Sequence, residues 1–157
     1  MQCNTYKTLS VISRCGEVIY LLTGIPGGRN DREVWTSCDL YLNPHNYFSP
    51  GEWLAVDGGF IGDGPTIHSY NDMRNDEDKA DFNMVFTEVR KQVENTFGRV
   101  QMWFPIHGNL KKRWDCGQKL FKFTVKASFL MHNWIMRIRN LNYCPSTNPN
   151  YLYIRYL

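Results

Sequence analysis

The chain has 157 residues, which is enough for one domain with a buried core. Its 43% hydrophobic and 21% charged residues are ordinary globular values and argue against a disordered protein. A net charge of +3 permits a polyanionic partner, but the excess is too small to identify a nucleic-acid-binding protein by itself.

Cysteine usage and hydropathy restrict the compartment. The five cysteines are odd in number and irregularly spaced, so the sequence predicts neither a disulfide framework nor a CxxC metal or redox motif. We therefore expect a reducing compartment, the nucleus or the cytoplasm. The most apolar run, Leu120 to Ile138, contains two lysines, an arginine and a histidine, so no membrane span and a soluble protein are expected.

The first third of the chain predicts a hairpin followed by a short helix. Tyr6–Ser13 and Glu17–Thr23 are rich in strand-forming residues and flank a turn. The glycine-rich break Gly24–Gly28 lacks the Lys and Ser/Thr of a phosphate-binding P-loop. Asn30 or Asp31 can then cap a helix that ends between residues 37 and 40.

A buried strand is predicted at Trp53–Val56, which is wholly apolar and ends at Asp57-Gly58-Gly59. Such a strand places Asp57 at the carboxyl end of a sheet, where ligand sites of α/β proteins gather. The alternative is an aspartate that only forms the turn before glycine. Pro65–His68 predicts a further short edge strand.

The segment Asp81–Gly98 predicts an amphipathic helix that stops at Gly98. Its apolar residues form one stripe, and Glu94 falls about 100° from the centre of that stripe, beside Arg90. A carboxylate at this rim is able to face a cleft from a rigid backbone, as a metal ligand must. The alternative is a solvated surface glutamate paired with Arg90.

The last part of the chain predicts an extended aromatic run at Val100–Ile106, then a basic cluster, then a helix that starts at Gln118 or Lys119 and ends at Arg139. The cluster Lys111, Lys112 and Arg113 suits a phosphate backbone, or it is an ordinary solvated face. The helix is apolar over most of its circumference and is expected to lie largely buried on the sheet. We expect one domain over residues 1–140 and a loose C-terminal tail over 141–157.

Several segments together resemble the DDE nuclease domain of Harbinger-type transposases and the nucleases derived from them. The resemblance covers roughly residues 6–138. The segments that carry it are Tyr6–Leu9, Gly24–Gly27 with Asp31, Leu54–Phe60, Phe82-Asn83, Arg90 with Val93-Glu94, Phe97-Gly98 and Leu130–Asn133.

The resemblance implies an α/β protein with an RNase H-like mixed sheet flanked by helices. It also implies a Mg²⁺ or Mn²⁺ pair held by three carboxylates that cleaves DNA phosphodiester bonds, since hard cations prefer oxygen ligands. Asp57 corresponds to the second catalytic carboxylate and Glu94 to the third. Asp31 matches a recurrent family aspartate, and its role is left open between helix capping, support of the ligands and metal binding.

The chain departs from the family at its first catalytic aspartate, which the family carries on a strand before the hairpin. No aspartate precedes Asp31 in this sequence. We therefore expect an N-terminally truncated domain that lacks the first strand, exposes unpaired strand edges, holds a single weakly bound ion and cleaves DNA slowly or not at all.

Three functions compete at this point. The first is a metal-dependent endonuclease with Asp57 and Glu94 as ligands and Lys111, Lys112 and Arg113 on DNA. The second is a non-catalytic module, derived from a transposon, that binds DNA or protein; a separate protein partner would then supply DNA recognition. The third is an unrelated enzyme that uses His132 or a cysteine, although His132 lies in an apolar helix and is expected to be a core residue.

Overall fold

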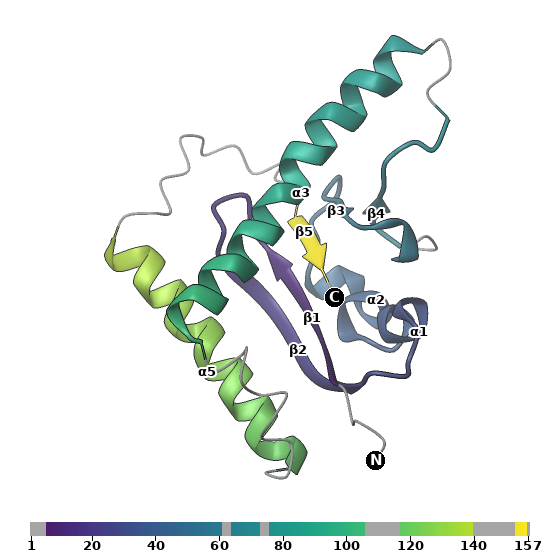
Figure 1. Cartoon of the computed structure of the whole chain (residues 1–157). Helices are drawn as coiled ribbons and strands as arrows, with labels where there is room; N and C mark the ends of the chain where they lie inside the picture. The colour runs from purple at the N-terminus through teal and green to yellow at the C-terminus, as the bar shows by residue number, and fades with distance from the viewer. Residues whose placement is uncertain (1–5, 61–63, 73–75, 106–116, 140–152, 157) are drawn as a thin grey trace.

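The computed structural model describes residues 6–60, 64–72, 76–105, 117–139 and 153–156 (Figure 1). These residues form a mixed α/β fold in which helices pack on both faces of one five-stranded sheet with the order β2-β1-β5-β3-β4. No helix in these ranges is long and apolar enough to cross a membrane.

The predicted hairpin is confirmed. β1 (Tyr6–Ile12) pairs antiparallel with β2 (Val18–Pro26) through a turn that contains Gly16 at φ +81°. β2 runs three residues further than expected and ends at Pro26, inside the glycine-rich break. The strand register shifts between Lys7 and Thr8, opposite Gly24, whose φ of +76° is left-handed and suits glycine.

The far side of the sheet is parallel. β3 (Leu54–Ala55) pairs in parallel with β4 (Thr66–Ile67), which lies at the sheet edge as predicted. Leu54, Ala55 and Val56 are almost completely buried, which confirms the buried strand, whereas Trp53 stays about half exposed.

The centre of the sheet corrects two expectations. β5 (Tyr153–Tyr156), from the segment that was predicted to be a loose tail, lies between β1 and β3. It runs antiparallel to β1 and parallel to β3. The edges that we expected to be exposed by a missing central strand are therefore paired along this segment, because backbone groups inside a sheet need partners.

Strand alternation divides the core into two faces. Leu9, Val11 and Leu54 face α1 (Asp31–Thr36) and α2 (Asp39–Leu42), where Trp35 is the largest fully buried side chain. Ile12 and Ala55 face α3 (Glu77–Trp103), which crosses the sheet in front of it in Figure 1. Two one-turn 3₁₀ helices lie on the side of α1 and α2: η1 (Pro44–Asn46) contacts α2, and η2 (Gly58–Phe60) contacts α1.

The central helix is longer than its sequence predicted. α3 continues through Gly98 to Trp103, so the predicted stop at Gly98 and the extended run from Val100 are wrong. Val100 is buried against Val125 and Phe129 of α5 (Gly117–Ile138). The burial of Val100 offsets the cost of a glycine inside a helix, about 1 kcal/mol.

Candidate functional site

Asp57 is fixed from both sides by buried residues. Val56 before it is buried and donates its N–H to Ile67 O at 2.8 Å, which extends the β3–β4 pairing. After it, η2 is anchored by buried Phe60, whose N–H donates to Asp57 O at 2.9 Å. Asp57 Oδ1 accepts the Gly58 N–H at 2.8 Å, yet its side chain is 51% exposed. The aspartate therefore forms the turn and still presents a carboxylate to solvent.

α3 brings Arg90 to this carboxylate. Arg90 Nη2 lies 3.7 Å from Asp57 Oδ2, which joins the end of β3 to the helix. Buried Phe86 and Val93 set the rotation of α3 against the sheet. Glu94 is exposed, one turn after Arg90 on the same side of the helix, where side chains four residues apart start about 5–6 Å from each other. Glu94 is therefore a neighbour, on the helix surface, of the arginine that approaches Asp57.

Asp31 packs against the glycine turn that follows Asp57. It opens α1, but the N-cap is Asn30, whose side chain accepts the Glu33 N–H at 2.7 Å. The capping role considered for Asp31 thus belongs to Asn30. A Cβ added to Gly59 would lie 3.4 Å from Asp31 Oδ2, so this carboxylate packs directly against the glycine turn that follows Asp57.

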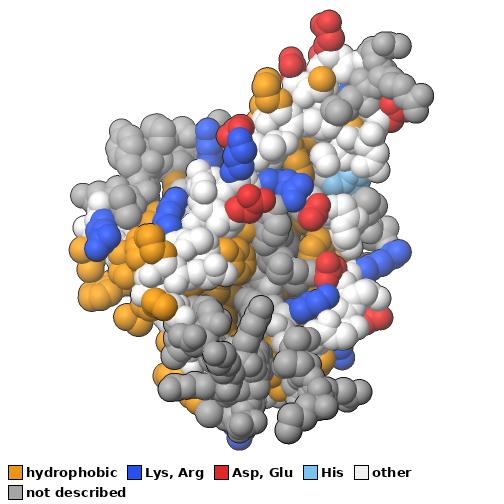
Figure 2. Space-filling view, in the orientation of Figure 1, with side chains coloured by type: hydrophobic (Ala, Val, Ile, Leu, Met, Phe, Trp, Pro, Cys, Tyr) orange, Lys and Arg blue, Asp and Glu red, His pale blue; other side chains and the backbone are white. Residues whose placement is uncertain are grey.

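Each of the two aspartates has a cationic partner. Lys7 Nζ lies 2.8 Å from Asp31 Oδ1 and donates to Arg29 O at 2.7 Å, while Arg90 faces Asp57. Figure 2 shows acidic and basic side chains gathered together in the middle of the visible face, around α3. All four groups are partly exposed, so water screens these ion pairs, which contribute little to stability.

The donor atoms fit a hard cation in kind but not in number. Carboxylates are the ligands that Mg²⁺ and Mn²⁺ prefer. Among the described residues, however, no group of three or more His, Cys, Asp or Glu side chains could hold a metal ion. The ligand set required for a metal pair is therefore incomplete in this part of the chain.

The sequence segment Leu130–Asn133 has a structural role. His132 is fully buried, and its Nε2 lies 2.9 Å from Gly16 O in the hairpin turn, as expected for a core histidine. Burial lowers the pKa of His132. Asn133 accepts from Val18 N at 2.9 Å and donates to Val18 O at 2.7 Å. These two residues attach α5 to the outer edge of the hairpin.

Sequence reasoning did not predict the partners of the carboxylates. Lys7 and Arg90 both stand inside segments that carried the family resemblance, which was the available signal, but their partners lie 24 and 33 positions away in the chain. Lys111, Lys112 and Arg113 lie outside the described residues.

Comparison with known proteins gives one match. The model of the DDE superfamily endonuclease family matches residues 1–133, which is most of the chain. A search of curated proteins and a search of solved structures each returned no significant match. The family match spans the hairpin, Asp57, the helix with Arg90 and Glu94, and the α5 residues that hold the hairpin. The chain belongs to the DDE superfamily endonuclease family.

Proposed function

We propose that this chain is a Harbinger-type member of its family, with an RNase H-like sheet in which Asp57 and Glu94 bind Mg²⁺ or Mn²⁺. The observation that carries the proposal is the 3.7 Å approach of Arg90 to Asp57. It brings the end of the buried strand against α3 one turn before Glu94, on a rigid backbone of the kind that a metal site requires. Asp31 packs against the same glycine turn and pairs with Lys7, so we assign it to the support of this turn and not to a third ligand position.

The sheet supports the RNase H-like part of the proposal. An antiparallel hairpin on one side and a parallel pair on the other meet at a central strand. In the family that the sequence resembles, the strand before the hairpin fills this centre and carries the first catalytic aspartate. Here β5 fills it, and no aspartate or glutamate occurs among its residues.

The chemistry follows from the ligand count. A bound divalent ion would lower the pKa of an attacking water and stabilise a leaving phosphate oxygen. In this proposal Asp57 and Glu94 would hold one such ion, and Arg90, 3.7 Å from Asp57 Oδ2, would compete with it for the Asp57 carboxylate. We propose weak metal binding and slow or absent strand cleavage by this chain.

DNA is the proposed partner, in the nucleus. Lys111, Lys112 and Arg113 are the candidate phosphate contacts, and three such contacts give weak, salt-sensitive affinity. Sequence recognition would then come from a separate protein.

Calorimetric titration of Mn²⁺ tests the metal site. Wild type should bind with a stoichiometry near one, and Asp57→Asn or Glu94→Gln should weaken that binding at least about ten-fold. Glu88→Gln is the matched control, since Glu88 is exposed on the same helix and pairs with Lys91. Binding that survives the loss of both Asp57 and Glu94 would rule out the proposed ligands.

A non-catalytic binding module is the second candidate. It is favoured by the cationic partners of Asp31 and Asp57 and by the absence of a three-ligand cluster among the described residues. This function predicts DNA binding that falls steeply with salt and is unchanged by Asp57→Ala. A metal-dependent nicking rate that Asp57→Ala abolishes would exclude it.

A further inference from the structure

The outer face of α5 exposes an apolar stripe. Six large apolar side chains on this helix are between 47 and 71% exposed, which corrects the expectation that the helix lies largely buried. We call them the outer stripe: Leu120, Phe123, Leu130, Met131, Trp134 and Ile138. The opposite side of the helix carries buried Val125, Phe129 and Met136, so the stripe is a second apolar surface in addition to the one that packs on the body.

The spacing of the stripe suits a partner helix. Leu120, Phe123, Ala127, Leu130 and Trp134 follow one another at intervals of three, four, three and four, the seam of a coiled coil. Ala127 in the middle leaves room for another backbone to approach. A membrane-surface helix needs no such period of 3.5 residues, since a flat bilayer offers no holes for side chains.

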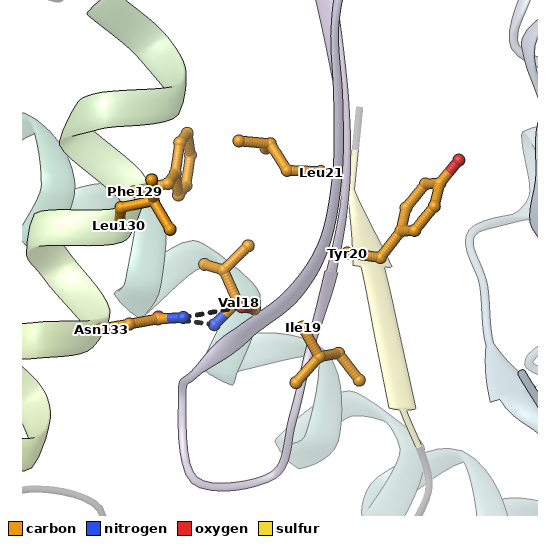
Figure 3. Close-up of a pocket in the computed structure, with 7 residues that line it drawn as sticks. All are labelled: Val18, Ile19, Tyr20, Leu21, Phe129, Leu130 and Asn133. Carbon is orange, nitrogen blue, oxygen red and sulfur yellow. Dashed lines mark hydrogen bonds between the residues drawn. The ribbon is translucent and has the colours of Figure 1, made fainter.

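A hollow beside the stripe enlarges this surface. It has a volume of about 170 Å³ and lies between α5 and the edge strand β2 (Figure 3). Leu130 and Phe129 line one wall, and Ile19 and Leu21 line the other. In Figure 3, Asn133 bonds to Val18 at one end of this hollow. An apolar side chain from a partner helix that lies on the stripe could enter here.

The area of the stripe is large for a surface that has no partner. If a fully exposed large side chain offers about 200 Å², the six side chains together expose roughly 700 Å². The largest apolar patch of a typical monomer is about 300–600 Å². A standard protein interface buries about 800 Å² on each partner. The stripe therefore offers about the surface that one specific interface requires.

The charge of α5 favours an acidic helix of another protein over a second copy of α5 as the occupant of the stripe. Lys119, Lys126 and Arg137 fall within about 20° of each other on a helical wheel and follow one flank of the stripe. Arg137 pairs with Glu17 at 2.8 Å, so Lys119 and Lys126 are the cations of this flank that a partner would meet. α5 contains no Asp or Glu. In an antiparallel pair of α5 helices from two copies, the flanks that carry Lys119 and Lys126 would face each other and repel. An acidic flank on the partner would instead complement them.

We propose that the outer stripe of α5 binds an amphipathic helix of a partner protein whose polar flank is acidic. The partner helix lies along the 3-4 spaced seam, inserts an apolar side chain beside β2, and places Glu or Asp against Lys119 and Lys126. This proposal rests on α5 alone and is independent of the metal site at Asp57.

Fluorescence anisotropy with labelled synthetic peptides tests it on the full chain. The probe is a helical peptide of about three heptads with Leu at the seam positions and Glu at the flanking positions. We expect the chain to bind it, and to bind a peptide with Lys at the flanking positions at least about ten-fold more weakly. Leu130→Glu should weaken binding by a similar factor. Met84→Glu is the matched control, because Met84 is 63% exposed on α3, and it should leave binding unchanged.

Charge reversal keeps the test decisive if a single variant folds poorly. The double variant Lys119→Glu with Lys126→Glu should lose the Glu peptide and gain the Lys peptide, a swap that misfolding cannot produce. Equal binding of both peptides by wild type would overturn the proposal. So would light scattering that shows a dimer of the chain abolished by Leu130→Glu, or binding of anionic phosphatidylserine vesicles that Leu130→Glu abolishes while neither peptide binds. Mn²⁺ titration of Leu130→Glu should match wild type, which separates this surface from the metal site.

Discussion

Replacement of Asn133, a partly exposed residue of α5, should lower the free energy of unfolding more than most substitutions on this helix surface. It bonds to both backbone groups of Val18, at 2.9 and 2.7 Å, where the hairpin edge meets the helix. Replacing it by alanine removes two hydrogen bonds of about 0.5–1.5 kcal/mol each. Val18 is only partly buried, so water can compensate in part. We expect Asn133→Ala to lower the free energy of unfolding by about 2 kcal/mol.

Urea unfolding followed by far-UV circular dichroism measures this change. With a slope near 2 kcal/mol/M, the midpoint should fall by about 1 M at an unchanged slope. Asn133→Asp should lose nearly as much, because a carboxylate accepts from Val18 N but cannot donate to Val18 O. Asn95→Ala, at an exposed position of α3, is the control and should change stability by less than about 0.5 kcal/mol. A loss below 0.5 kcal/mol for Asn133→Ala would refute the reasoning.

Three further predictions concern stability. Burial lowers the pKa of His132, so the native state binds fewer protons than the unfolded chain. The free energy of unfolding should therefore fall as the pH drops below about 6.5, by at most about 1.4 kcal/mol per pH unit from this group. In urea titrations at several pH values, His132→Gln should remove this part of the pH dependence. Gly24→Ala should cost about 1–2 kcal/mol in thermal unfolding, because φ there is +76° and a Cβ would collide with Lys122, whereas Gly28→Ala, which meets nothing within 4 Å, should be nearly neutral. Asn30→Ala removes the N-cap bond of α1 and should lower stability by about 1 kcal/mol by the same measurement, and an unchanged melting temperature would show that the cap is not needed.

Local patterns predicted most elements but not their ends. The hairpin, the buried strand before Asp57 and the last helix all depend on a residue period that is visible within a few positions, and all three were confirmed. Gly98 failed as a stop signal because the packing of Val100 on α5 is a contact between distant segments. Propensity is a weak term beside such burial.

At the candidate site, the sequence predicted the carboxylates but not their cationic partners. Asp57 and Glu94 were singled out from sequence by their places after a strand and on a helix rim, and their metal role stays a prediction. Arg90 and Lys7, which approach the carboxylates of Asp57 and Asp31, could not be assigned to these partners, because an ion pair between distant segments has no local sequence pattern.

The sequence by itself determined the family, the strand and helix types and the apolar periodicities, because these follow from the local alternation of side chains and from short segments in a fixed order. Only the tertiary structure decided that a segment near residue 154 lies in the centre of the sheet, that Arg90 approaches Asp57, and that α5 turns one of its two apolar faces to solvent. A periodic pattern shows that a face is apolar, but what covers that face depends on where the rest of the chain packs.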